Sequence, residues 1–263
     1  MSSVVAAMTV EVIRTPHGQM PAYVAAPAAA GPWPGVVVVH DFAGMSHDLR
    51  NQADWLAGEG YLAAAPDLYY WGSRLRCLWT IMREIAAGRG RTFDDINSVR
   101  GWLAGQDRCT GKVGVIGFCM GGAYAVALAP GHGFSAASVN YGGCPKDAGQ
   151  ALAGACPIVG SYGGKDRSPM GRTAAPRLEQ ALTALGVDHD VKVYPGAGHG
   201  FLNDTDPADA TPLLVFLAKI SGTRYHEPSA RDARRRIAAF FSKHLEGLTR
   251  ESAPVGRVAG PHG

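Results

Sequence analysis

Three residues of the types needed for nucleophilic catalysis follow one another along this chain: Cys119, Asp166 and His199. A cysteine thiolate can attack a carbonyl carbon, a histidine can move the proton, and a carboxylate can hold the histidine ring in place. Together they would support acyl transfer through a thioester intermediate. We therefore ask whether the surrounding sequence would bring these three side chains together.

The cysteine lies in the stretch "VIGFCMGGAYAVALA" (115–129), between a run that predicts a strand and a run that predicts a helix at 120–129. A nucleophile on such a sharp turn has strained backbone torsions, so its neighbours must lack bulk, as the glycines of "GFCMG" do. The helix N-terminus favours a thiolate at Cys119. The alternative is a packing cysteine, since free cysteine is among the most buried residue types. The strand-to-helix position favours the nucleophile.

The acid and the histidine each follow a predicted strand. Asp166 comes after "PIVGSYGGK", and His199 comes within "VKVYPGAGHGF". Such loops converge at the carboxyl edge of a parallel sheet, and the order nucleophile, acid, histidine is that of an α/β-hydrolase. Taken alone, Asp166 could be a turn residue. His199 could cap a helix, or it could lie in a loop with its ring nitrogens hydrogen-bonded and no catalytic role. Their joint occurrence in this order favours function for both.

An earlier strand, "VVVVH" (36–40), leads into the loop "DFAGM". In this type of site the loop supplies one oxyanion-binding N–H and the residue after the nucleophile supplies the other. We therefore expect Phe42 and Met120 to be the two donors. Asp41 either influences the nucleophile or serves as a turn or capping residue, and the sequence does not separate these alternatives.

Predicted strands alternate with predicted helices along most of the chain. This pattern indicates an α/β-hydrolase fold: a mainly parallel central sheet with helices on both faces, preceded by an antiparallel hairpin at 8–25. We expect helices at 46–58, 92–104, 120–129 and 172–185, and a last helix that begins at Ser229 with Asp232 in a capping box. We expect one domain over 1–249. Within it, 203–228 would form a lid or a subunit contact, and 250–263 would be a disordered tail.

Composition excludes several classes of protein. The 263 residues carry a net charge of only +3, which gives no reason to expect nucleic acid or a membrane as partner. Five cysteines without CxxC spacing argue against disulfides and a zinc site, and the N-terminus does not resemble a secretory signal. We expect a soluble, cytoplasmic protein without metal or cofactor, with 234–236 ("RRR") on a solvated helix face. The oligomeric state is left open.

The stretches "GFCMGG", "GGKD", "PGAGHGF" and "HDFAG…ADWLAGEGYLAAAPDLY" occur in order over most of residues 8–202. In these the chain resembles the dienelactone hydrolase family, α/β-hydrolases that use a Cys-His-Asp triad. The resemblance implies that Cys119 is the nucleophile, Asp166 the acid and His199 the base. It also places Asp41 where the family often has a glutamate near the nucleophile.

The chain departs from the family pattern where the family binds a substrate carboxylate. An arginine is expected shortly after the histidine, and this chain has Asn203 near that position. A second arginine belongs after "PDLY", where Arg76 is our choice over Arg74 and Arg83. We therefore expect hydrolysis of a small-molecule carboxylic ester or lactone (EC 3.1.1 class, carboxymethylenebutenolidase-like) rather than of dienelactone itself.

Two other functions were considered. A glutamine amidotransferase also places cysteine in a GxCxG turn, but it would usually pair that cysteine with a His-x-Glu motif, which this chain lacks. A non-catalytic binder or sensor with the same fold would keep the pocket without turnover, and it stays the alternative to the hydrolase.

Overall fold

The computed structural model of the protein describes residues 5–168, 171–204, 206–209, 215, 219 and 221–246. Within these residues, eight strands form one sheet in the order β1-β2-β4-β3-β5-β6-β7-β8. The strands are β1 (Val5–Thr15), β2 (Gly18–Pro27), β3 (Trp33–Val39), β4 (Leu62–Pro66), β5 (Cys109–Phe118), β6 (Ala136–Asn140), β7 (Ile158–Gly163) and β8 (His189–Tyr194). β1 pairs antiparallel with β2, and β2 antiparallel with β4, whereas all later pairs are parallel. The predicted fold class and hairpin are confirmed.

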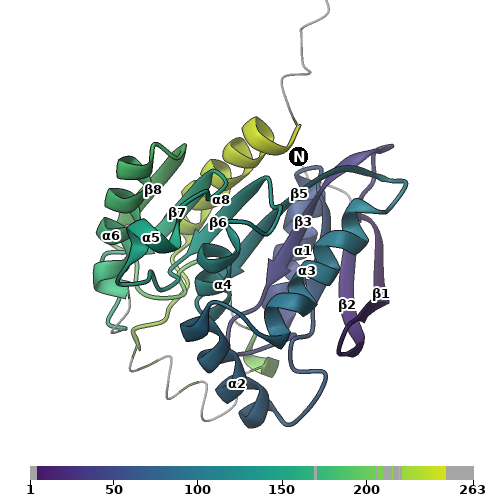
Figure 1. The fold of residues 1–263 in the computed structure, drawn as a ribbon, viewed down its shortest axis with the longest axis horizontal. Helices are drawn as coiled ribbons and strands as arrows, with labels where there is room; N and C mark the ends of the chain where they lie inside the picture. The colour runs from purple at the N-terminus through teal and green to yellow at the C-terminus, as the bar shows by residue number, and fades with distance from the viewer. Residues whose placement is uncertain are drawn as a thin grey trace, which may run out of the picture.

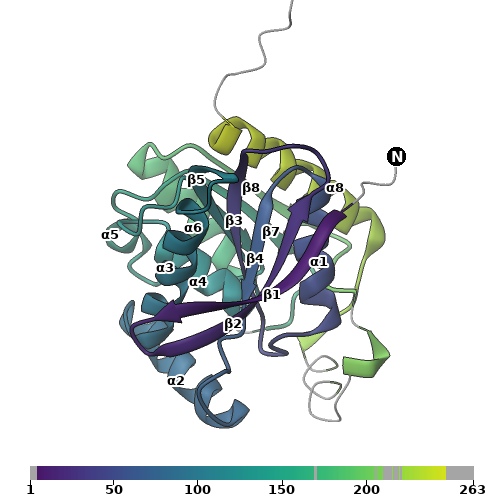
Figure 2. The ribbon, with the colours of Figure 1, turned by 90° about the vertical axis from the view of Figure 1, so that its right-hand side faces the viewer.

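Helices cover both faces of the sheet. They are α1 (His47–Gly58), α2 (Arg74–Ala87), α3 (Arg91–Ala104), α4 (Met120–Leu128), α5 (Ala148–Ala151), α6 (Gly171–Leu185) and α8 (Glu227–Phe241), with short helical turns η1 (Pro207–Asp209) and η2 (Ser242–Glu246). Figure 1 shows α3 and α4 in front of the sheet and α1 and α8 behind it. Figure 2 shows the β1–β2 hairpin at one edge, between α1 and α3.

The two helical layers bury two separate apolar cores. One core joins the sheet to α3, α4 and α6, and the other joins it to α1 and α8. Val36 to Val39 of β3 explain why the central strands need both layers, because all four side chains are fully buried and successive side chains point to opposite faces. The sheet is thereby fixed from both sides, and so are the loops at its carboxyl edge.

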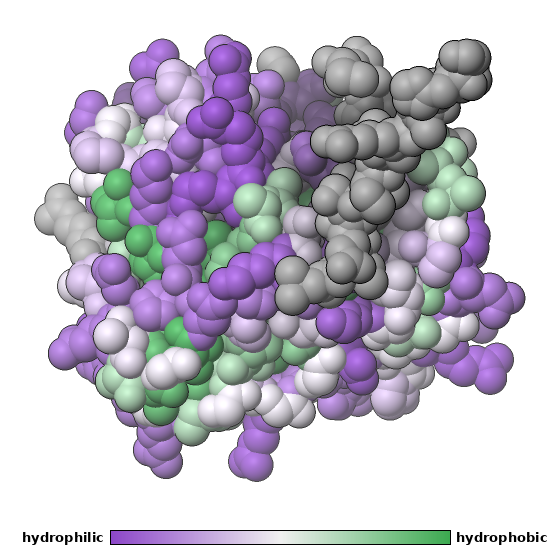
Figure 3. Space-filling view, turned by 90° about the horizontal axis from the view of Figure 1, so that it is seen from above, coloured by the Kyte–Doolittle hydropathy of each residue, from purple (hydrophilic) through white to green (hydrophobic). Residues whose placement is uncertain are grey.

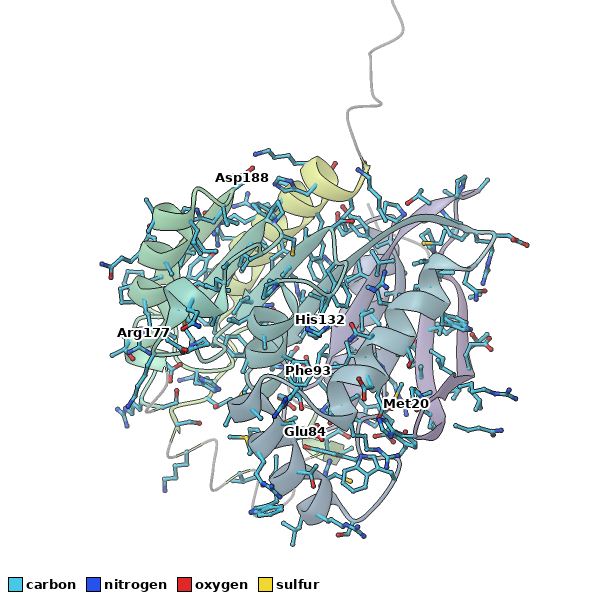
Figure 4. All side chains as sticks on the ribbon, viewed as in Figure 1. Met20, Glu84, Phe93, His132, Arg177 and Asp188 are labelled. Atoms are coloured by element: carbon cyan, nitrogen blue, oxygen red, sulfur yellow. The ribbon has the colours of Figure 1, made fainter. Side chains whose placement is uncertain are left out.

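Helix α2 was not predicted. Its buried residues are Cys77 and Ile81, while Leu75, Trp79 and Met82 are exposed, so its apolar residues do not mark a single face. Instead, α2 is joined to the start of α3 by Glu84, whose carboxylate accepts the Arg91 and Thr92 N–H groups, both at 2.9 Å. Figure 4 labels Glu84 on α2 beside Phe93 of α3.

The predicted start of the last helix was wrong. Helix α8 begins at Glu227 after His226, with Pro228 in the first turn, where proline is favoured. Ser229 therefore lies inside the helix, and its hydroxyl contacts Nδ1 of His226 at 2.8 Å.

The prediction of a solvated face for 234–236 was also wrong. A helix turns by about 100° per residue, so three consecutive arginines point in three directions. Arg235 is exposed, but Arg236 keeps only 14% of its side chain exposed and contacts Asp190 at 2.7 Å. The predicted tail at 250–263 lies outside the described residues.

The surface of this protein is mixed in polarity. Seen from above, hydrophobic residues form small patches separated by hydrophilic ones (Figure 3). Ion pairs contribute to the hydrophilic parts, such as Lys243 with Asp188 at 2.5 Å. Asp188, labelled in Figure 4, lies just before β8.

None of the helices in the described part of the chain is long and apolar enough to span a bilayer.

Candidate active site

Cys119 occupies the turn between β5 and α4 with φ +54° and ψ −110°. This backbone conformation is costly for a residue with a side chain and persists only where the surroundings enforce it. The neighbouring glycines permit the turn, because a Cβ on Gly117 would lie 1.9 Å from the Gly121 carbonyl oxygen, and one on Gly121 would lie 2.2 Å from that of Val39. The packed backbone thus holds the thiol at the carboxyl edge of the sheet.

The structure brings the three sequence-predicted side chains into one line. Nε2 of His199 lies 3.0 Å from Sγ of Cys119, and Nδ1 of the same ring lies 2.8 Å from Oδ2 of Asp166. The other carboxylate oxygen of Asp166 accepts the Ser168 N–H at 2.7 Å. Both oxygens of the acid are therefore engaged, and the imidazole contacts both partners at once.

Burial and partner charges set the protonation of this line. For His199, burial disfavours the charged ring, but hydrogen bonds to Asp166 and Cys119 and their charges outweigh it and raise the pKa of His199 to about 10. For Asp166, burial opposes ionisation, but the hydrogen bond and charge of His199, helped by Ser168, hold the pKa of the carboxyl below its usual value. The ring of His199 is therefore protonated and the carboxyl of Asp166 ionised near neutral pH.

A cavity of about 300 Å³ opens above the thiol. Cys119, His199, Phe42 and Asn203 line it, together with residues from the 203–228 segment such as Tyr225. The walls mix apolar and polar groups, as small-molecule sites do. The cavity therefore gives a ligand of modest size direct access to the sulfur.

The two expected oxyanion donors both lie beside the thiol. Phe42 lines the cavity, and its N–H has no partner among the described residues. Met120 is the first residue of α4, where the N–H has no acceptor within the helix. Neither N–H group has an acceptor in the part of the chain that the structure describes.

Asp41 lies on the same cavity wall, and its Oδ1 accepts the Ala43 N–H at 2.7 Å. Burial, aided by the charge of Asp48, raises the pKa of Asp41 to about 6, although the Ala43 hydrogen bond and the His199 charge oppose the rise. Its carboxylate therefore holds the turn and interacts with the charge of His199, and an influence of Asp41 on the nucleophile stays a prediction.

Asn203 lines the cavity, and both ends of its amide group are bonded to other side chains. Its amide oxygen accepts the hydroxyl of Tyr141, and its Nδ2 donates to Asp48 Oδ2 at 2.5 Å. Asp48 also accepts the Asp204 N–H at 2.9 Å and the Gln52 amide at 3.3 Å. This buried network anchors the chain just beyond His199.

Asp48 and Tyr141 were missed by the sequence analysis. Tyr141 has φ +43° and packs its ring edge-on against that of His199, with centroids 5.1 Å apart. Asp48 is in the first turn of α1, a common place for an acidic residue that stabilises the helix end. Nothing local in the sequence distinguishes either residue, because their partners lie 62 and 155 positions away.

The arginine chosen from the sequence does not line the cavity. Arg76 places its guanidinium over the ring of Trp71, 5.7 Å from the centroid. Arg74 is the α2 arginine that reaches the loop after β3, where it donates to the Ala43 carbonyl. The arginine on the cavity wall is Arg224, from the 203–228 segment.

The last part of the 203–228 segment is bonded to both catalytic loops. The Arg167 N–H donates to the Ser221 carbonyl at 3.2 Å, and the Arg224 N–H donates to the His199 carbonyl at 3.2 Å. A Cβ on Gly198 would lie 2.2 Å from the Gly222 carbonyl oxygen, so the backbones touch. Residues 221–226 are therefore part of the site wall.

Comparison with known proteins places this site in a family. The family model described as "Dienelactone hydrolase family" matches residues 20–245. The chain belongs to the dienelactone hydrolase family. The predicted resemblance is confirmed, and family membership supports a hydrolase.

Proteins with similar sequences include one of Yersinia pestis named "Putative carboxymethylenebutenolidase", 29% identical over 86% of this chain and 84% of its own length. A relative of the same name from Methylorubrum extorquens is 30% identical over 73% of this chain and 71% of its own length.

Solved structures agree on the fold. The "Putative Dienelactone Hydrolase" of Klebsiella pneumoniae has a TM-score of 0.72 at 28% identity, covering 90% of this chain and 98% of its own. Dienelactone hydrolase from Anabaena variabilis has a TM-score of 0.66 at 19% identity, covering 91% and 98% of the two chains, a likeness of fold alone.

Proposed function

We propose that this protein hydrolyses a small carboxylic ester, lactone or thioester through a Cys119–His199–Asp166 triad. The thiolate of Cys119 attacks the carbonyl carbon, and the N–H groups of Phe42 and Met120 bind the resulting oxyanion. The imidazolium of His199 gives its proton to the departing oxygen or sulfur as the acyl–sulfur bond forms. His199 then takes a proton from water, the hydroxide attacks the thioester, and the acid leaves as the thiolate is restored.

The observation that carries this proposal is the unbroken line of contacts from thiol to carboxylate, 3.0 Å and 2.8 Å long, at the floor of the cavity. The pKa of His199, raised to about 10, supports a protonated ring that can give its proton to the leaving group. Two unpartnered N–H groups beside the thiol support the oxyanion role, and one such donor contributes on the order of 3 kcal/mol to catalysis. A thiolate is a good leaving group, so activated esters and lactones suit the site better than amides.

The test is hydrolysis of 4-nitrophenyl acetate and of short lactones by the wild type and by Cys119→Ala. We expect saturable turnover that is lost in Cys119→Ala and retained in the matched control Cys109→Ala, which removes a free cysteine at the opposite end of β5. Mass spectrometry of a short reaction would detect the acyl group on Cys119. Turnover that persists in Cys119→Ala would contradict the mechanism, and absence of turnover across the panel would favour the non-catalytic binder.

A further inference from the structure

A second hollow, of about 680 Å³, lies beside the catalytic cavity. Its walls come from the loop that carries Asp166, the loop that carries His199, Lys219 and residues 222–227. Thr223, Arg224 and Tyr225 line both hollows. The second hollow, which we call the basic cleft, therefore adjoins the cavity at Cys119 across this segment.

The basic cleft gathers positive charge. Lys165, Arg167, Lys219 and Arg224 all line it, and all four residues are exposed. None of their charged groups has a hydrogen-bond or ion-pair partner among the described residues. Lys192, by contrast, contacts Asp232 at 2.7 Å.

Opposing charge at the basic cleft is small. Glu227 lines it, but its carboxylate contacts Arg231 at 2.5 Å. The carboxylates of Asp41 and Asp204 line the catalytic cavity and not the basic cleft. An anionic group on a bound molecule would thus be repelled from the Asp41 side and attracted toward the cleft.

We propose that the basic cleft holds a phosphate-type anionic group carried by the substrate, several bonds away from the carbonyl that Cys119 attacks. Four unpaired cations suit a doubly charged group with three acceptor oxygens better than a single carboxylate. Backbone flanks the cations at Gly196, Gly198 and Gly222, where no side chain blocks a bulky oxyanion. This inference rests on the proposed function, because it names the class of ester or thioester that the same site accepts.

The experiment compares two pairs of probes that differ by one anionic group. S-acetylpantetheine and its 4′-phosphate place the charge on the departing side, whereas 4-nitrophenyl butyrate and 4-nitrophenyl 4-phosphonobutyrate place it on the acyl side. We expect kcat/KM for the phosphorylated or phosphonylated member of one pair to exceed that of its neutral partner by about tenfold or more. The ratio should fall as salt rises from 0.1 to 1 M, since the screening length shrinks from about 10 Å to about 3 Å.

Substitutions at Arg224 assign the effect to the basic cleft. Arg224→Gln should reduce the ratio of charged to neutral kcat/KM about tenfold, and Arg224→Lys should restore most of it because the charge is kept. Lys112→Gln is the matched control, since Lys112 is an exposed cation near the amino-terminal end of β5, away from the site. That variant should leave the ratio at the wild-type value.

Dissociation constants of the intact probes on Cys119→Ala, measured by calorimetry, give a readout that does not depend on turnover. Tighter binding of the charged member, weakened by adding Arg224→Gln, supports the basic cleft even if no probe is hydrolysed, in which case the proposed function alone fails. Equal binding and equal turnover within both pairs overturn the basic cleft. If the neutral esters are nevertheless hydrolysed through Cys119, the proposed function stands without it.

Discussion

Replacing Asp166 by asparagine removes one charge from the line of contacts while keeping its shape. The carboxylate accepts two hydrogen bonds, from His199 Nδ1 at 2.8 Å and from the Ser168 N–H at 2.7 Å. An asparagine has a single acceptor oxygen, so its NH₂ group must face one of these two donors. Either the ring of His199 or the Ser168 amide then loses its partner.

The size of the effect follows from the burial of the pair. The side chains of His199 and Asp166 are 8% and 1% exposed. A buried hydrogen bond to a charged group contributes about 1.5–3 kcal/mol. At about 1.4 kcal/mol per tenfold change, we expect kcat/KM for 4-nitrophenyl acetate to fall roughly 10- to 100-fold in Asp166→Asn. The free energy of unfolding in urea should fall by about the same 1.5–3 kcal/mol at pH 7.

The stability difference should also depend on pH. The pKa of Asp166 is lowered by folding, so its contribution is present above the unfolded pKa and disappears as acidification protonates the carboxyl. The pKa of His199 is raised to about 10, so its contribution is present below the unfolded value and is lost as pH rises through 10. The difference in the free energy of unfolding between the wild type and Asp166→Asn, measured in urea, should be largest near pH 5–6. It should become smaller at lower and at higher pH. A stability difference that does not change with pH would refute the reasoning, and so would a kcat/KM of Asp166→Asn within threefold of the wild-type value.

Three further substitutions test other parts of the site. Gly121→Ala should lower the free energy of unfolding by about 3 kcal/mol or leave no folded protein, because its Cβ would meet the Val39 carbonyl oxygen; an unchanged urea midpoint would contradict this. Tyr141→Phe leaves the amide oxygen of Asn203 without its donor, so thermal denaturation should reveal a loss of about 1–3 kcal/mol. Folding raises the pKa of Asp41 to about 6, so its carboxyl is neutral below that pH and charged above it. Because the charged form stabilises the neighbouring imidazolium, kcat/KM should rise through pH 6 in the wild type and lose that limb in Asp41→Asn.

The sequence predicts the order of strands and helices because most strands are apolar on both faces. Cys119 and Asp166 each follow such a strand, whereas His199 follows β8, most of whose residues are not buried. Cys119, Asp166 and His199 could be found in this way, since the end of a parallel strand fixes the edge at which its loop emerges. Helix α2 could not, because Trp79 and Met82 are exposed and blur its periodicity.

Partners that are distant in sequence were also beyond reach of the local pattern. Asp48 resembles an ordinary first-turn acid, and only the folded chain brings it to Asn203. The position of Arg76 after β4 predicted that it would bind the substrate. In a helix, however, the direction of each side chain depends on its place in the turn. The guanidinium of Arg76 therefore lies over Trp71, while Arg74 reaches the loop after β3.

The backbone hydrogen bonds that join residues 221–226 to the loops carrying Asp166 and His199 have a consequence for redesigning the cavity. The backbones of Ser221 and Arg224 are hydrogen-bonded to the loops that carry Asp166 and His199. These two residues are therefore a suitable point at which to join a replaced segment to the native chain. A graft that exchanges residues 205–220 and rejoins the original sequence at Ser221 would replace Val215, which lines the cavity, and would keep these backbone bonds. Libraries that vary the length and composition of residues 205–220, with residues 221–226 unchanged, are suited to altering which ligands this cavity accepts.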